Sequence, residues 1–259
     1  MKTVALFFCI CLFILHGVEV RKVQAAEELI VSAAASLTNV MNAVKDDFQF
    51  FNPSIRVIFN FASSGSLVQQ IRHGAPVDIF VSANQFFMDR LSDEGLILSN
   101  SRIDFTSNQI VLIVPLHSRC PLAGLENLQL PGFQRIAIGH PETVPAGRYA
   151  KASLLNAGLW DALKDKFIYA NSVRQVLAYT IREEVDAGFV YASDIMAANG
   201  RVREVVMLKN IDPILYPVAI IASSGHLDAA SGFIRFLHGE TGQRILDQYG
   251  FIRLQGEKP

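Results

Sequence analysis

The spacing of the hydrophobic residues changes at Ser36. The apolar run Leu29-Ile-Val31 has the length and composition of a buried strand, and a short stretch of alanines leads from it to Ser36. Beyond it the apolar residues recur with the period of a helix, at Leu37, Val40, Met41, Val44 and Phe48. Ser36 is therefore predicted to lie where a strand passes into a helix N-terminus, at or next to the N-cap.

A turn of this kind favours a bound anion. The first backbone N–H groups of a helix have no acceptor within the helix, and the positive end of the helix dipole lies among them. The alanines before Ser36 let another group come close to the backbone. One such turn alone is more often an ordinary capped helix, so the prediction depends on whether other turns join it.

Similar turns recur along the chain, each with a short apolar strand before it and a helical pattern after it. The strands that precede them are expected at residues 54–61, 135–139 and 167–170. The four turns, the first included, are predicted at Ser36, Ser64, Ala146 and Val173. A further short strand, residues 188–191, ends on Tyr191. The alternation of strands and helices is typical of α/β architecture.

Two long apolar strands, residues 107–114 and 216–222, bracket the middle of the chain. Two crossings of this kind suggest two lobes. We expect a discontinuous first lobe of residues 26–108 and 217–259, and a second lobe of residues 109–216. The cleft between the lobes is the expected binding site, and the four turns would aim helix N-termini into it.

The first 25 residues have the features of a secretory signal peptide. Lys2 precedes an apolar run over residues 4–15, and Val23-Gln-Ala25 offers small residues around a cleavage site. The run is too short to span a bilayer, so we expect export and cleavage near Ala25. Small residues do not precede Cys9 or Cys11 as in a lipid-attachment motif, and no lipid anchor is expected.

The charge balance gives no indication of a nucleic-acid surface. Removal of the signal takes away three of the 23 basic and one of the 24 acidic residues, which leaves a formal charge of −3. Cys120 is the single cysteine of the mature chain, so no internal disulfide can form and the core must hold the exported fold. The histidines lack the spacing of a zinc site.

Seven short motifs follow one another in the mature chain: Ala33-Ala-Ala-Ser-Leu-Thr38, Phe61-Ala-Ser-Ser64, Gly74-Ala-Pro-Val-Asp-Ile-Phe-Val-Ser-Ala83, Pro141-Glu-Thr-Val-Pro-Ala-Gly147, Asn171-Ser-Val-Arg174, Gly188-Phe-Val-Tyr-Ala-Ser-Asp194 and Tyr249-Gly-Phe251. Each is weak alone. In this order and spacing they closely resemble the periplasmic molybdate-binding proteins of ABC importers, over essentially the whole mature chain.

The resemblance implies a two-lobed fold of the type II periplasmic binding protein family and a particular ligand site. In that family, hydrogen bonds from hydroxyl and backbone groups hold the anion, without a charged side chain. The matching donors are the hydroxyls of Ser36, Ser64 and Tyr191 and the amides of Ala146 and Val173. Molybdenum would be bound through the oxygens of molybdate, and tungstate is expected to bind as well.

The resemblance also implies a role in transport. The chain would be a periplasmic monomer that delivers its anion to the membrane permease of an ABC importer, without catalysis, cofactor or nucleic acid. It departs from the family pattern at three positions. His140 stands where an acidic or amide residue is usual, Asn84 where aspartate is, and Phe87 where tryptophan is. None is a proposed ligand, so the departures concern the tuning of the site.

Other interpretations stay open. A sulfate or thiosulfate receptor of the same fold is the nearest alternative. An exported hydrolase would need a general base beside Ser36 or Ser64, and the sequence offers neither a candidate nor a GxSxG elbow. Arg148 and Arg174 lie beside proposed ligands, where they would steer anions or, as we rather expect, form solvated helix faces. Tyr191 without the resemblance would equally be a core aromatic residue.

Overall fold

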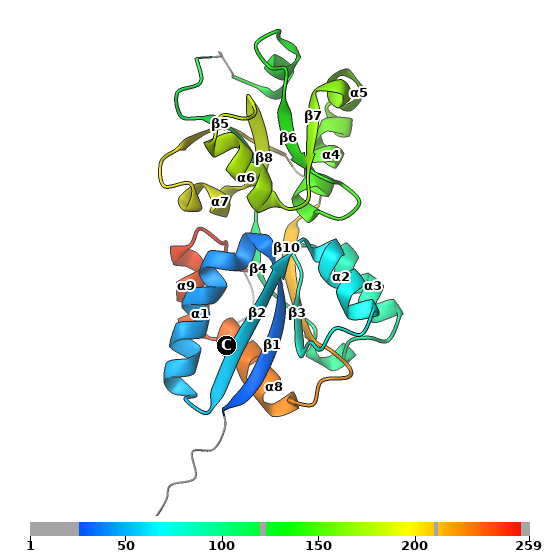
Figure 1. Cartoon of the computed structure of the whole chain (residues 1–259), viewed down its shortest axis with the longest axis vertical. Helices are drawn as coiled ribbons and strands as arrows, with labels where there is room; N and C mark the ends of the chain where they lie inside the picture. The colour runs from blue at the N-terminus through cyan, green and yellow to red at the C-terminus, as the bar shows by residue number, and fades with distance from the viewer. Residues whose placement is uncertain (1–25, 120–122, 210–211, 255–259) are drawn as a thin grey trace, which may run out of the picture.

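The computed structural model describes residues 26–119, 123–209 and 212–254. Two bodies lie one above the other along the long axis of the molecule, each built around one five-stranded sheet (Figure 1). The strand order is β2-β1-β3-β10-β4 in the first sheet and β7-β6-β8-β5-β9 in the second. The predicted α/β fold with two lobes is confirmed.

The first sheet carries helices on both faces. Its strands are β1 (Glu27–Ala34), β2 (Ile55–Ala62), β3 (Ile79–Val81), β10 (Ile214–Ile220) and β4 (Ile103–Asn108). One face packs against α1 (Thr38–Phe51), α8 (Leu227–His238) and α9 (Glu240–Gln248), and the other against α2 (Ser64–Arg72) and α3 (Gln85–Asp93). Because both faces are covered, the central strand β3 and most of β10 are apolar and buried rather than alternating, while the outer strands β2 and β4 carry polar residues as well.

The second sheet has the same plan. Its strands are β5 (Ile110–Pro115), β6 (Ile136–Gly139), β7 (Phe167–Ala170), β8 (Ala187–Tyr191) and β9 (Val202–Met207). Its helices are α4 (Pro145–Asn156), α5 (Trp160–Leu163), α6 (Val173–Ile181) and α7 (Ala192–Ala197). In both sheets parallel strands end at the edge that faces the other lobe, so their strand-to-helix turns meet there.

Short 3-10 helices complete the chain, at Ala35–Leu37 (η1), Ser99–Ser101 (η2), Leu125–Gln129 (η3) and Lys164–Lys166 (η4). Of these, η1 forms the turn between β1 and α1 that was predicted at Ser36.

The predicted strand over residues 107–114 is wrong as a single element. It is two strands, because β4 ends at Asn108 in the first sheet and β5 begins at Ile110 in the second. Asn108 Oδ1 accepts a hydrogen bond from the N–H of Gln109, which takes that N–H out of any ladder. β10 begins at Ile214, ahead of the strand start predicted at 216. The lobe boundaries at 108/109 and 216/217 stay a prediction.

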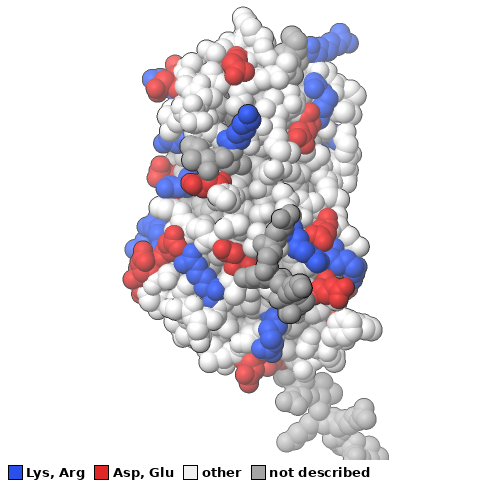
Figure 2. Space-filling view, turned by 180° about the vertical axis from the view of Figure 1, so that it is seen from behind, with Lys and Arg blue, Asp and Glu red and all other residues white. Residues whose placement is uncertain are grey.

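The signal peptide and its cleavage site fall on residues 1–25, outside the described residues, as does Cys120. No helix within the described ranges is long and apolar enough to cross a membrane. Basic and acidic side chains are interspersed over the face seen in Figure 2. That face therefore has no extended field of one sign that would attract a polyanion.

Candidate functional site

The five predicted ligand residues surround one small cavity between the lobes. Even with the open solvent at its mouth counted, its empty volume is only about 200 Å³, and Ser36, Ser64, Ala146, Val173 and Tyr191 all line it, together with Ser63 and small apolar residues. Sites for drug-sized organic ligands usually occupy about 300–1,000 Å³. The cavity therefore suits a small ion better than an organic solute.

Ser36 lies in η1 with its side chain almost fully buried. Its Oγ is 3.2 Å from the hydroxyl of Tyr216, and Asn108 Nδ2 donates to that hydroxyl at 3.5 Å. Asn108 Oδ1 is already taken by the N–H of Gln109. This arrangement favours Tyr216 as the donor to Ser36, which leaves the proton of Ser36 free for the cavity. Nothing in the sequence pattern pointed to Tyr216, because it lies 180 residues from Ser36.

Ser64 is the first residue of α2 and is fully buried. The preceding Ser63 is the N-cap, and its side chain accepts from the N–H of Ser66. The Oγ of Ser64 accepts from the N–H of Ala83 at 3.1 Å. Since a hydroxyl has only one proton, this contact leaves Ser64 able to donate into the cavity.

The second lobe contributes backbone groups. Ala146 is in the first turn of α4, directly after Pro145, and Val173 is the first residue of α6. N–H groups at these positions have no acceptor within their helix. Pro145 has no N–H to satisfy and suits the first helical position. The buried side chains of Ala146 and Val173 carry no polar atom, so these residues can meet an anion only through their amides.

Tyr191 ends β8 and is buried, with its ring centroid 5.7 Å from that of Tyr216. Its hydroxyl donates to the carbonyl of Ala83 at 3.4 Å, across the two lobes, and this single proton would have to turn from the carbonyl for Tyr191 to donate to an anion. Burial raises the pKa of Tyr191 well above its ordinary value, and burial raises the pKa of Tyr216 as well. Both hydroxyls therefore stay protonated, and remain donors, at any physiological pH.

Arg174 is not the solvated helix-face residue that we expected. Its side chain is only 23% exposed, and its Nε lies 3.1 Å from Oδ1 of the fully buried Asp194. Burial raises the pKa of Asp194 to about 6, opposed by the charge of Arg174. The carboxylate is thus mostly ionised at neutral pH, and the pair has no net charge.

Arg148 lies against an aromatic ring of the other lobe. Its guanidinium carbon is 3.8 Å from the centroid of Phe86 in α3, a cation–π contact. The prediction of a solvated helix face thus holds for neither arginine. Around the cavity itself, the potential ligands are neutral donors.

The three departures from the family pattern lie outside the cavity lining. Asn84 is the N-cap of α3 and accepts from the N–H of Phe87. Phe87 is buried in the smaller hydrophobic cluster of the first lobe. His140 is exposed, with its ring 5.4 Å from that of Tyr169. These residues cap, pack or face solvent.

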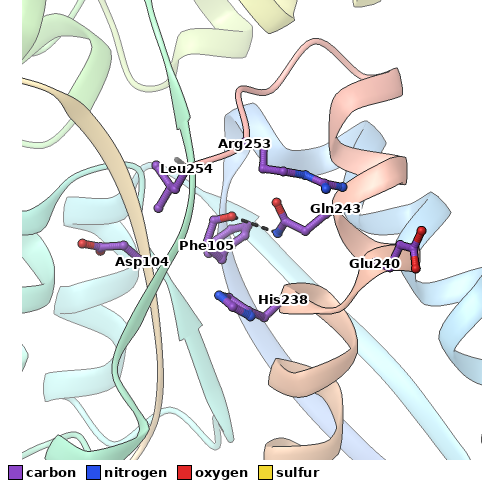
Figure 3. Close-up of a pocket in the computed structure, with 7 residues that line it drawn as sticks. All are labelled: Asp104, Phe105, His238, Glu240, Gln243, Arg253 and Leu254. Carbon is purple, nitrogen blue, oxygen red and sulfur yellow. Dashed lines mark hydrogen bonds between the residues drawn. The ribbon is translucent and has the colours of Figure 1, made fainter. Parts of the chain in front are cut away.

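A larger hollow lies elsewhere in the first lobe. It measures about 600 Å³ and lies between β4, the α8–α9 junction and the chain near Leu254 (Figure 3). Gln243 points into it and donates to the carbonyl of Phe105 at 2.9 Å. None of the strand-to-helix turns reaches it. Within the described residues, His, Cys, Asp and Glu side chains do not gather in groups of three that could hold a metal ion.

Several known proteins are similar to this chain over most of its length. The profile of bacterial extracellular solute-binding proteins matches residues 29–252. The molybdate-binding protein ModA of Escherichia coli is 36% identical over 230 residues, 86% of this chain and 88% of the relative. ModA of Haemophilus influenzae is 34% identical over 232 residues, 88% of this chain and 91% of the relative. The structure of the periplasmic molybdate-binding protein of Azotobacter vinelandii superposes with a TM-score of 0.78 at 25% identity, and covers 88% of this chain and all of that one.

Proposed function

The chain belongs to the family of bacterial extracellular solute-binding proteins, and we propose that it is a periplasmic receptor for molybdate and tungstate. The observation that carries the proposal is the cavity of about 200 Å³ lined by Ser36, Ser64, Ala146, Val173 and Tyr191. The names of the relatives at 34–36% identity support the choice of anion.

The donor set fits a fully deprotonated tetrahedral oxyanion. Such an ion offers only acceptors, so every contact should be a donor, and hydroxyl and amide protons meet this requirement from several sides. Each hydrogen bond to a charged group contributes roughly 1.5–3 kcal/mol. Local dipoles at helix N-termini set the field in the site, so a chain with net negative charge can still bind an anion.

Transport follows from the placement of the donors in two lobes. Ser36 and Ser64 come from the first lobe, and Ala146, Val173 and Tyr191 from the second. The anion contacts all five only when the lobes meet, so it shifts the population toward the closed form. We propose that the permease of an ABC importer receives the anion from this closed form. The anion is the cargo, and the protein acts as a monomer without cofactor or catalytic step.

A hydrolase finds no support in the site. The neighbours of the two candidate serine hydroxyls are the hydroxyl of Tyr216 and the N–H of Ala83. Neither group is a histidine or a carboxylate able to take the proton of a nucleophile. A sulfate receptor of the same fold would share the donor geometry, and the distinction depends on the size of the anion.

Thermal unfolding of residues 26–259 with different anions tests the proposal. Molybdate and tungstate, nearly equal in size, should each raise the melting temperature by about 5–10 °C at a concentration 100-fold above Kd. Sulfate has shorter bonds and leaves donors stretched, while phosphate near neutral pH often carries a proton that faces donors. Both should act weakly. Equal stabilisation by sulfate would favour the sulfate receptor.

A further inference from the structure

We propose that Arg174 is a clasp that holds the two lobes closed without touching the anion. The clasp consists of the Arg174 guanidinium, the Asp194 carboxylate beside it in the second lobe, and the carbonyl oxygens of Ala35 and Ser36 in the first lobe. The inference deepens the proposed function and rests on it, because the clasp acts on the closure that traps the anion.

The contacts of the clasp cross the cleft. Nε of Arg174 donates to the carbonyl of Ala35 at 3.2 Å, and Nη2 donates to the carbonyl of Ser36 at 3.1 Å. Nε also lies 3.1 Å from Oδ1 of Asp194. A planar guanidinium offers its donors in a rigid fork, which a lysine ammonium does not reproduce.

The guanidinium is engaged by these partners and does not line the anion cavity. Within the described residues it lines a neighbouring cavity with Asn39, Met196 and Tyr249, and Ser36 stands between the two cavities and lines both. Asp194, with a fully buried side chain, offsets its charge. A neutral pair that does not line the anion cavity can neither choose between anions nor attract them strongly from solution.

The clasp and the anion site close in the same movement. Arg174 follows Val173 directly, so one turn of α6 brings an amide to the anion and a guanidinium to the opposite lobe. The carbonyls that receive the guanidinium belong to the turn that carries the Ser36 hydroxyl. The contacts of the guanidinium with the first lobe and the contacts of the anion with both lobes can therefore form only together, when the lobes close. The clasp adds to the stability of the closed form by the same amount for every anion.

This position predicts a kinetic signature. Release requires the lobes to part, which breaks the clasp, while capture by the open form does not involve it. Loss of the clasp should therefore raise koff and leave kon unchanged. It should also lower the closed fraction of the ligand-free protein, because part of the closing free energy is independent of the anion.

Stopped-flow kinetics with molybdate and tungstate test the clasp in residues 26–259. In Arg174→Gln, koff should rise about 10- to 100-fold, as expected for the loss of one charge-assisted hydrogen bond or more. The affinities for the two anions should fall by the same factor. Arg174→Lys keeps the charge but not the fork, and should show a smaller rise. Arg182→Gln removes a charge from an exposed residue at the end of the same helix and should change neither rate.

The ligand-free protein provides a second measurement that does not depend on the identity of the anion. Spin labels on α2 and on the loop before α4, at Gln69→Cys and Glu142→Cys in a Cys120→Ser background, report the distance between the lobes by pulsed electron paramagnetic resonance. Both labelled residues are exposed. The short-distance population should be smaller in Arg174→Gln than in the parent.

Each outcome decides between roles for Arg174. A fall in kon that disappears at high salt, with koff unchanged, would make Arg174 a steering charge and overturn the clasp. Unchanged kinetics and unchanged distances in Arg174→Gln would overturn it as well. If both Arg174 variants fail to fold, the residue acts in folding and the clasp is wrong. If the parent binds no molybdate, the proposed function fails, while the ligand-free distances still decide the clasp.

Discussion

The two lobes offer different kinds of donor to the same cavity. In the first lobe the donors are the side-chain hydroxyls of Ser36 and Ser64, each in contact with a neighbouring hydroxyl or amide. In the second lobe Ala146 and Val173 offer backbone amides at the start of α4 and α6, and Tyr191 adds one hydroxyl.

The difference has consequences for mutation. A hydroxyl donor is removed by one substitution, and the direction in which its O–H bond points depends on the partner that occupies its lone pair. An amide at a helix N-terminus survives every substitution except proline, and its direction is set by the helix. The first lobe should therefore be sensitive to side-chain changes, and the second lobe sensitive mainly to changes that prevent closure.

The largest effect is expected from a substitution that keeps the lobes apart. The N–H of Gly65 in α2 donates to the carbonyl of Thr143 at 3.0 Å, across the cleft. A Cβ at this position would lie 2.7 Å from Thr143 Cα and 2.7 Å from its carbonyl oxygen, both backbone atoms that cannot step aside. Gly65→Ala should weaken molybdate binding by at least about 100-fold, which is about 2.7 kcal/mol or more.

The matched control for this change is Gly232→Ala in α8. A Cβ there would meet no atom closer than 3.9 Å, and that is the tip of the Arg235 side chain. Gly232→Ala should leave the ligand-free melting temperature nearly unchanged or raise it slightly, because alanine is the better helix former. Gly65→Ala should lower it somewhat, because its Cβ would also lie 2.9 Å from the buried ring of Phe87 in the same lobe. Equal molybdate affinities in a calorimetric titration of both variants would contradict closure at Gly65.

Ser64→Ala comes next. It removes a donor that the anion cannot replace in a closed cavity, so affinity should fall by roughly 1.5–3 kcal/mol, or about 10- to 100-fold. It also leaves the N–H of Ala83 without the acceptor it has now, so the ligand-free melting temperature should fall. Ser66→Ala touches the cap contact with Ser63 instead, and its effect on affinity should be much smaller. Equal losses of affinity would mean that the wrong serine was assigned.

Tyr191→Phe should have an intermediate effect. The change deletes the hydroxyl that contacts the Ala83 carbonyl across the lobes and keeps the buried ring. We expect an affinity about tenfold lower and a smaller decrease in radius of gyration on adding molybdate, measured by small-angle scattering. The ligand-free fold should be unchanged in circular dichroism. An unchanged affinity and an unchanged compaction would remove Tyr191 from the site.

The smallest effect on affinity is expected from Val173→Ala. The buried side chain packs in the core, so its truncation should lower the free energy of unfolding by about 2 kcal/mol. The amide remains in place, and calorimetry should find molybdate affinity within about threefold of the parent. A loss comparable to that of Ser64→Ala would show that the second lobe relies on side chains after all.

The same difference explains what the sequence could reveal. Ser36 and Ser64 stand at turns where the hydrophobic period changes, so physical reasoning alone singles them out. The same pattern predicts turns at Ala146 and Val173, but their side chains look like those of any apolar helix residue, and it is the resemblance to a family motif that identifies their amides as donors. A backbone N–H donor can belong to any residue except proline, so the residue type at that position does not reveal it.

Contacts between residues that are far apart in the chain could not be predicted from the sequence. Ser36 and Tyr216 are 180 residues apart, and Arg174 lies 139 residues from Ala35. The change of sheet at Gln109 was hidden because apolar residues on both sides read as one run. Sequence periodicity describes single elements, whereas these features depend on how two lobes meet.

The central claim is that neutral donors from both lobes bind the anion, while Arg174 and Arg148 contact the opposite lobe and not the anion. A crystal structure of residues 26–259 with tungstate tests it directly, because the anomalous signal of tungsten locates the ion. We expect one strong peak in the cavity, with oxygens within about 2.7–3.2 Å of the hydroxyls of Ser36, Ser64 and Tyr191 and the amides of Ala146 and Val173. Arg174 should still contact the Ala35 and Ser36 carbonyls. A peak bound by the guanidinium of Arg174 or Arg148, or by donors of one lobe alone, would contradict the account.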